Sequence, residues 1–146
     1  MTNEQIVRSA CQVVWSEGDV SRAEEFYSQD FSTNYPEFPE TNWGIGPQGV
    51  RDFVQGLRGG ISDYCERIDD LIDAGDRIIV RLAISGTHTG ELLGIPATGK
   101  LFEFREIDII RLENGKIVEQ IGLTDYMTFL MQLGLIGVPG SEAAGE

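Results

Sequence analysis

Hydrophobic and polar residues alternate along two segments near the C-terminus, one over 100–112 and one from 116 onward, which meet at Asn114-Gly115. An Asn-Gly pair between alternating hydrophobic residues is the strongest local signal for a β-hairpin. We therefore predict two long antiparallel strands. Every second side chain of a strand lies on the same face. In the first strand this face is apolar apart from two carboxylates, and comprises Phe102, Phe104, Glu106, Asp108 and Ile110.

The N-terminal part of the chain has the pattern of helices. The spacing of a capping box occurs at Thr2 and Ser21, which predicts one helix ending near Gly18 and a second ending before Phe31. Proline favours the first helical position, so Gly46-Pro47 predicts the start of a third helix. Its apolar residues follow with helical spacing, and are Val50, Phe53, Val54 and Leu57.

The remaining segments predict strands, loops and a closing helix. Residues 64–73 and 77–87 alternate like strands, and 32–46 is interpreted as a loop because of its prolines and turn-forming residues. A short helix after the hairpin is expected to end at Gly134. This order predicts an α+β fold, in which a twisted, mainly antiparallel sheet of four to six strands forms a cone. The N-terminal helices would cover the sheet and enclose an apolar cavity.

Composition and charge restrict the partners of this chain. Of its 146 residues, 24 are acidic and 11 are basic, which gives a net charge of −13. Such a charge repels phosphate backbones and anionic lipids, so we expect no nucleic-acid or membrane partner. Neither a signal peptide nor a membrane-spanning run is visible, and a cytoplasmic location is the default expectation. We expect a single domain over 1–136, followed by a flexible acidic tail over 137–146.

Metal and phosphate chemistry find little support in the sequence. Cys11 and Cys65 lie on separate predicted elements without a CxxC spacing, and His88 is the single histidine. We therefore predict no metal site. No glycine-rich phosphate loop follows a strand, and no GxSxG nucleophile motif is present.

The two carboxylates on the apolar strand face are the first candidates for catalysis. Burial among apolar side chains would raise the pKa of Glu106 and Asp108 and make them usable as acid or base near neutral pH. The alternative is that they reach solvent at a rim or pair with Arg81 or Arg105. His88 is the third catalytic candidate because imidazole titrates near neutral pH, with a structural hydrogen bond as its alternative.

Three strings of this chain resemble the SnoaL-like polyketide cyclase family of the NTF2-like superfamily. They are NWGIGPQGVRDF, GDRIIVRLAISGTHTGELLGIPATGK and IDIIRLENGKIVEQIGLTDYMTFLMQLG. The resemblance implies an NTF2-like cone, commonly paired through its sheet into a homodimer or homotetramer, with a pocket for a hydrophobic small molecule. Characterised members of the family close the last ring of anthracycline precursors by intramolecular aldol condensation without a metal or cofactor.

The resemblance also shows where this chain departs from the family. The family's acid/base aspartate corresponds to Gly122, and the histidine beside it corresponds to Gln120. In the preceding strand, the positions of the family's pocket Gln and His are Glu106 and Asp108. We therefore hypothesise that the acidic function has moved across the hairpin.

Six further residues are selected as candidates for substrate binding. Asn34 and Tyr35 stand where family members place polar pocket groups. For Asp125 the competing interpretation is a helix cap, and for Trp43 it is structural packing. The full set is Asn34, Tyr35, Trp43, Phe104, Gln120 and Asp125.

These features lead to one main functional hypothesis and two alternatives. The main hypothesis is a cofactor-independent enzyme of cyclase or isomerase type, in which Asp108 and Glu106 move protons on a hydrophobic carbonyl compound while His88 orients it. The alternative is a non-catalytic ligand-binding or accessory protein, which Gly122 favours. Hydrolysis of an epoxide or ester by activated water is the third option.

Overall fold

The structure is a computed structural model that describes residues 1–36, 44–138 and 140. Five strands form one sheet in the order β1-β5-β4-β3-β2. Strand β1 pairs with β5 in parallel, and the other neighbours are antiparallel. The strands are β1 (Tyr27–Asn34), β2 (Cys65–Asp73), β3 (Arg77–Thr87), β4 (Leu101–Glu113) and β5 (Lys116–Thr124).

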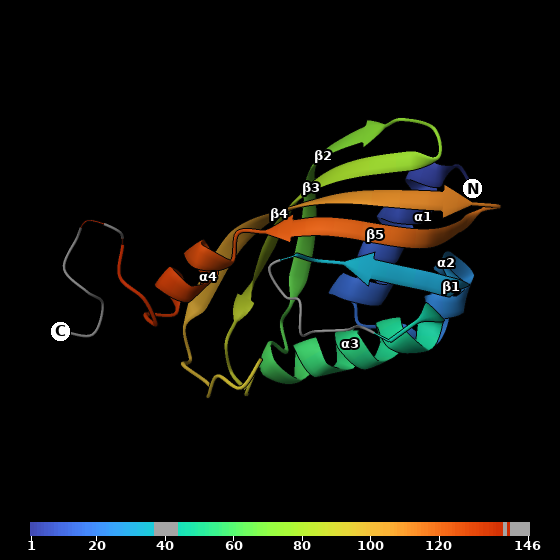
Figure 1. The fold of residues 1–146 in the computed structure, drawn as a ribbon. Coiled ribbons are helices and arrows are strands. Elements are labelled where there is room, and N and C mark those ends of the chain that lie inside the picture. The colour runs from blue at the N-terminus through green and yellow to red at the C-terminus, as the bar shows by residue number, and fades with distance from the viewer. Residues whose placement is uncertain (37–43, 139, 141–146) are drawn as a thin grey trace.

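Helices cover one face of this sheet. Figure 1 shows α1 and α3 on the same side of the curved sheet, with α4 following the end of β5. The two N-terminal helical regions are continued by short segments of other helix types, η1 (π-helical) and η2 (3₁₀). The helices are α1 (Asn3–Ala10), η1 (Cys11–Ser16), η2 (Val20–Arg22), α2 (Ala23–Phe26), α3 (Gly46–Gly60) and α4 (Tyr126–Gln132). The α+β cone predicted from the sequence is therefore confirmed.

The predicted hairpin is present as β4 and β5. Asn114 and Gly115 both have positive φ, at 51° and 75°, which a two-residue type I′ turn requires. Side chains of β4 alternate as predicted, so that Phe102, Asp108 and Ile110 are buried. The helix after β5 ends before Gly134, whose φ of 76° is the left-handed conformation of a helix terminus.

The ends of the N-terminal helices follow the predicted chemistry only in part. Thr2 forms the predicted capping box with Gln5, and α1 continues through η1. The capping box predicted at Ser21 is wrong, because the Ser21 hydroxyl donates to Asp19 and α2 begins after Arg22 without a side-chain cap. Proline at the start of α3 stands where it was predicted.

Strand β1 covers 27–34, so two predicted bounds were wrong. The second helix was predicted to run to just before Phe31 but ends at Phe26, and 32–34 belong to the strand instead of the loop predicted over 32–46. Tyr27 and Phe31 are buried on this strand, and Thr33 pairs with Gln120 of β5. A parallel strand has its partner far along the chain, so its pairing leaves little local signal. The binding candidate Trp43 and most of the predicted tail lie outside the described residues.

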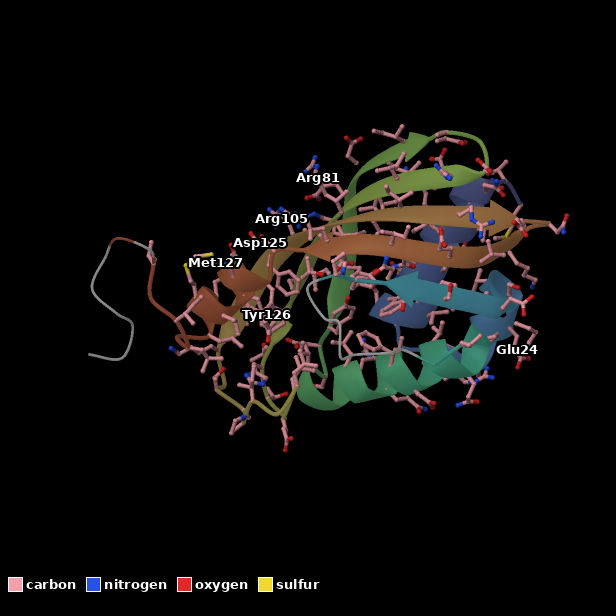
Figure 2. The ribbon with its side chains drawn as sticks, viewed as in Figure 1. Glu24, Arg81, Arg105, Asp125, Tyr126 and Met127 are labelled. Carbon is pink, nitrogen blue, oxygen red and sulfur yellow. The ribbon has the colours of Figure 1, made fainter. Side chains whose placement is uncertain are left out.

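The outer face of the sheet is partly apolar and partly charged. Ile107 stands opposite Leu123, and Ile109 opposite Ile121, and all four side chains are exposed. Figure 2 shows Arg81 and Arg105 on the side of the sheet that faces away from α3. None of the described helices is long and apolar enough to cross a membrane.

Candidate active site

A cavity of about 450 Å³ lies between the inner face of the sheet and the helices. Its volume falls in the range of small-molecule sites. Aromatic and aliphatic side chains dominate its walls, with a few polar groups among them. The lining residues are Trp15, Tyr35, Asp52, Phe53, Gly56, Leu57, Tyr64, Glu66, Ile84, Glu91, Leu92, Leu93, Phe104, Glu106, Gln120, Thr124, Tyr126 and Phe129.

Asp108 lies at the centre of a buried polar cluster beside this cavity. Its side chain is 0% exposed. The Tyr35 hydroxyl donates to Asp108 Oδ1 at 3.1 Å, and the Gln120 amide donates to Oδ2 at 3.2 Å. The same amide donates to the Tyr35 hydroxyl at 2.7 Å. Tyr35 and Gln120 line the cavity, so the carboxyl of Asp108 lies one layer behind its surface.

Gly122 makes room for this carboxyl. In the antiparallel pair of β4 and β5, Asp108 stands directly opposite Gly122. A Cβ at Gly122 would overlap with Asp108 Oδ1 and with the ring of Tyr35. The space that a side chain at position 122 would fill is therefore occupied by Asp108, which comes from the neighbouring strand.

Glu106 is the carboxyl of β4 that reaches the cavity. The Thr124 hydroxyl donates to Glu106 Oε1 at 2.6 Å. A hydrogen bond also links Glu106 with Asp108, two residues further along the same face. Glu106 thus connects the buried cluster around Asp108 with the volume where a ligand would lie.

The pKa of Asp108 is raised well above its ordinary value. Desolvation is the main cause, and the charge and hydrogen bond of Glu106 add to it. Two carboxyls in hydrogen-bond contact cannot both ionise easily, so such a pair keeps one proton between them to a higher pH than a lone carboxyl does. No Lys, Arg or His stands among the described lining residues to neutralise them. The pair can therefore accept a proton at one carboxyl and donate one from the other.

Glu66 is a further carboxyl in the cavity wall, and the sequence reasoning missed it. It lies on β2, and the Tyr64 hydroxyl donates to its Oε1 at 2.6 Å. Desolvation raises the pKa of Glu66 to about 8. The alternation of Tyr64 and Glu66 in a predicted strand was a usable signal, because it places both side chains on one face.

The other selected residues lie in different surroundings. His88 is 0% exposed and outside the cavity lining, and its Nδ1 lies 3.0 Å from the Thr98 hydroxyl. Among the described residues, its Nε2 has no hydrogen-bond partner. Asn34 is exposed near the end of β1. Asp125 caps α4 by accepting from the Thr128 amide at 3.1 Å. Of the selected binding residues, Tyr35, Phe104 and Gln120 line the cavity.

Several aromatic lining residues come from elements that the sequence predicts only as helices. Trp15 comes from η1, Phe53 from α3 and Phe129 from α4. Figure 2 shows Tyr126 extending from α4 on the side away from Arg105, and this residue also lines the cavity. Helical periodicity predicts that a side chain faces inward, and cannot distinguish a core contact from a cavity wall. Among the described residues, no group of His, Cys, Asp and Glu could hold a metal ion.

Residues 5–133 match the family model described as SnoaL-like polyketide cyclase. Aklanonic acid methyl ester cyclase DnrD of Streptomyces peucetius is 34% identical over 91 residues, which are 61% of this chain and 62% of that protein. DauD of Streptomyces sp. (strain C5), which carries the same name, is 40% identical over 91 residues, 61% of this chain and 56% of that protein. The chain thus matches less than two thirds of the length of these two relatives. Nogalonic acid methyl ester cyclase of Streptomyces nogalater is 25% identical over 80% of this chain and 87% of that protein.

Solved structures share the fold. TsrD from Streptomyces laurentii superposes with a TM-score of 0.81 and 26% identity, covering 91% of this chain and 95% of that one. A SnoaL-like polyketide cyclase from Agrobacterium tumefaciens superposes with a TM-score of 0.76 over 92% of this chain and 99% of that one. Because its sequence identity is 19%, this likeness shows the fold alone.

Proposed function

Since the chain belongs to the SnoaL-like polyketide cyclase family, we propose that it closes a ring in a polyketide by intramolecular aldol addition without a cofactor. The observation that carries this proposal is the position of Asp108. Its carboxyl fills the space above Gly122, which is the position that the family resemblance assigns to the acid/base aspartate. The acid is thus supplied from the opposite strand of the hairpin.

The carboxyl pair has the chemistry that an aldol ring closure needs. The carboxylate of the pair takes the proton from the carbon next to a carbonyl, and the resulting enolate attacks a second carbonyl carbon. The new carbon–carbon bond leaves an alkoxide, which takes a proton back from the pair. Glu106 touches the ligand, and Asp108 shares its proton and holds its orientation through Tyr35 and Gln120.

The walls of the cavity favour a neutral, aromatic ligand. Acidic side chains at the cavity surface repel a free carboxylate, and the described lining contains no cation to balance one. An ester of the same compound lacks this charge. Large aromatic walls suit a flat, fused-ring skeleton. We propose a polyketide methyl ester as substrate and choose aklanonic acid methyl ester, which the relatives' names supply, as the probe.

The test is conversion of this ester by the purified chain without added metal or cofactor. We expect a product of unchanged mass whose new ring is identified by chromatography and NMR, since an aldol ring closure only moves a proton and joins two carbons. Control reactions contain no protein, or protein whose cavity is blocked by Gly56→Trp, a substitution in the wall of the cavity on α3.

Two other results would contradict the proposal. Tight binding of the ester without any turnover would favour a non-catalytic binding protein. A product heavier by one water, or cleavage of the ester, would favour the hydrolase alternative. The occupied space above Gly122 supports the cyclase over the binding protein, because a protein that only binds needs no buried acid there.

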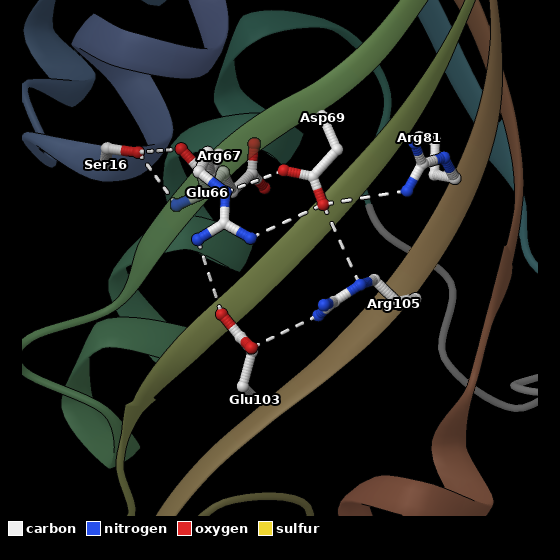
Figure 3. A network of polar contacts seen from close by, with 7 residues as sticks. All are labelled: Ser16, Glu66, Arg67, Asp69, Arg81, Glu103 and Arg105. Carbon is white, nitrogen blue, oxygen red and sulfur yellow. Dashed lines mark hydrogen bonds and ion pairs between the residues drawn. The ribbon is translucent and has the colours of Figure 1, made fainter.

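We also propose that two copies of this chain pair through the outer face of the sheet. Four exposed apolar residues form two cross-strand pairs there, Ile107 with Leu123 and Ile109 with Ile121. Beside these pairs lies a network of positively and negatively charged side chains, which Figure 3 shows. Arg105 lies 3.8 Å from Asp69 and 3.4 Å from Glu103. Because the face carries both signs, a second copy can meet it with complementary charges.

Leu123→Glu is expected to convert this assembly to a monomer, because it buries a charge in an apolar contact. The measurement is sedimentation velocity at micromolar concentration. Ile45→Glu is the matched control, since Ile45 is also exposed but precedes α3 in the helical layer. A wild-type chain that sediments as a monomer would contradict the proposal, and so would a Leu123→Glu variant that keeps the wild-type mass.

A further inference from the structure

Glu66 forms part of the cavity wall on a different strand from the carboxyl pair. It stands opposite Ile84 of β3, and Ile84 stands opposite Phe104 of β4. Glu106 lies two residues beyond Phe104, so Glu66 and Glu106 are two strand spacings apart, about 10 Å across the sheet, and are also offset by two residues along the strands. A ligand that fills the cavity can touch both carboxyls at once.

The side chain of Glu66 is held in place by groups that donate to it. The Tyr64 hydroxyl lies 2.6 Å from Oε1, and the Cys11 thiol forms a second hydrogen bond. The backbone of Glu66 is fixed as well, because its amide donates to the Ser16 hydroxyl at 3.0 Å, as Figure 3 shows. Cys11 and Ser16 belong to the π-helical segment η1, and such segments occur frequently at functional sites.

When Glu66 is protonated, Glu66 and Tyr64 together have one O–H donor more than their mutual hydrogen bond uses. The carboxylic acid and the phenol then hold two O–H protons, and a single hydrogen bond links the two groups. Whichever group donates in that bond, the other O–H remains available to a ligand. Both residues line the cavity, so an oxygen atom of the ligand is the natural acceptor.

We propose that protonated Glu66, together with Tyr64, holds a carbonyl oxygen of the ligand by a hydrogen bond while the Asp108–Glu106 pair moves the proton. The proposal rests on the cyclase function for the carbonyl substrate, but the donor role can be tested by binding alone. Donation to a carbonyl oxygen stabilises the negative charge that develops there during aldol attack. Glu66 would thereby determine which carbonyl of the substrate is attacked.

Burial and the charge of Glu106 favour the neutral form of Glu66 near pH 7. Desolvation raises its pKa to about 8, and the charge of Glu106 acts in the same direction, outweighing the donated hydrogen bonds of Tyr64 and Cys11. Two positively charged residues also lie near Glu66. They are Arg8 of α1 and Arg67 of β2, which line a second hollow together with Glu66. Because the acid form is the donor, ligand affinity should fall as pH rises through about 8 and recover when pH is lowered.

The experiment measures affinity for aklanonic acid methyl ester, and kcat/KM where it is converted, from about pH 6 to about pH 10. For the wild type we expect both to fall above about pH 8. Glu66→Gln keeps a donor at every pH, so its profile should be flat there and exceed that of the wild type at the alkaline end. Glu66→Leu has no donor and should bind at least about tenfold more weakly at neutral pH.

Two further measurements separate the possible failures. Asp70→Asn, a change at an exposed acid that lies on the same strand as Glu66 but is not one of the lining residues, should keep the wild-type profile. Infrared difference spectra between about pH 7 and about pH 9.5 should show loss of a protonated carboxyl in the wild type, and less in Glu66→Gln. An unchanged alkaline fall in Glu66→Gln, or an unchanged spectrum, overturns the role of Glu66. Absence of turnover with a flat Glu66→Gln affinity profile overturns the cyclase function alone.

Discussion

Glu106→Gln and Asp108→Asn are expected to lower kcat for ring closure by about 100-fold or more, with a much smaller change in KM. Proton transfer by a positioned side chain typically contributes 10²–10⁴-fold, and an amide cannot perform it. Neither substitution changes the size of the side chain. Gln at position 106 keeps an acceptor for Thr124, and Asn at position 108 keeps one of the two oxygens that accept from Tyr35 and Gln120. The effect should therefore appear in the transition state more than in binding, which the comparison of kcat with kcat/KM measures.

The matched control is Asp52→Asn, because Asp52 is an acid that lines the same cavity but is exposed on α3. It should leave kcat within about threefold of the wild type. Thermal unfolding checks that each variant is folded. For Asp108→Asn we expect stability close to that of the wild type, because removal of a desolvated charge offsets the loss of one of the two accepting oxygens. Wild-type turnover in both carboxyl variants would show that the pair does not carry the reaction.

Most of the fold could be predicted from local patterns in the sequence. The hairpin at Asn114-Gly115 was found because its turn and its flanking alternation agree, and α3 because proline and helical spacing agree. Strand β1 could not be found in this way. Its pairing with β5 is parallel, and the contact between Thr33 and Gln120 joins residues far apart in the chain. Tertiary contacts of this kind override the local turn signal of the segment.

The candidate site, like the fold, could be predicted only where local patterns in the sequence determine it. Alternation placed Glu106 and Asp108 on one face, but it could not rank them by depth, and the structure places Glu106 at the cavity and Asp108 behind it. Nor could it show that Tyr35 and Gln120 donate to Asp108, because these contacts depend on the register between strands. Glu66 was not selected, because the alternation over 64–73 predicts a strand without showing that the face with Tyr64 and Glu66 borders a cavity.

The cross-strand hypothesis makes a second prediction, in which the acid is moved back to β5. Asp108→Gly should lose activity, because it deletes the carboxyl of the buried cluster. Gly122→Asp alone should destabilise the fold by about 1–3 kcal/mol, since a Cβ there overlaps with Asp108 and Tyr35. Combining the two substitutions removes the overlap and returns one carboxyl to the same space. We expect the kcat of the double variant to be at least about tenfold higher than that of Asp108→Gly.

The control for this exchange is Asp108→Gly combined with Gly122→Asn, which restores the volume without the acid. If position alone matters, the aspartate version recovers turnover and the asparagine version does not, while thermal unfolding gives similar stability for both. Recovery in both would mean that the cluster needs a filled space and hydrogen-bond partners for Tyr35 and Gln120. Recovery in neither would show that a carboxyl acts only from β4, next to Glu106, where the two share a proton. The exchange therefore tests whether the carboxyl only has to occupy this space or also has to lie next to Glu106 on β4. Recovery in the aspartate version alone is the result that the cross-strand hypothesis requires.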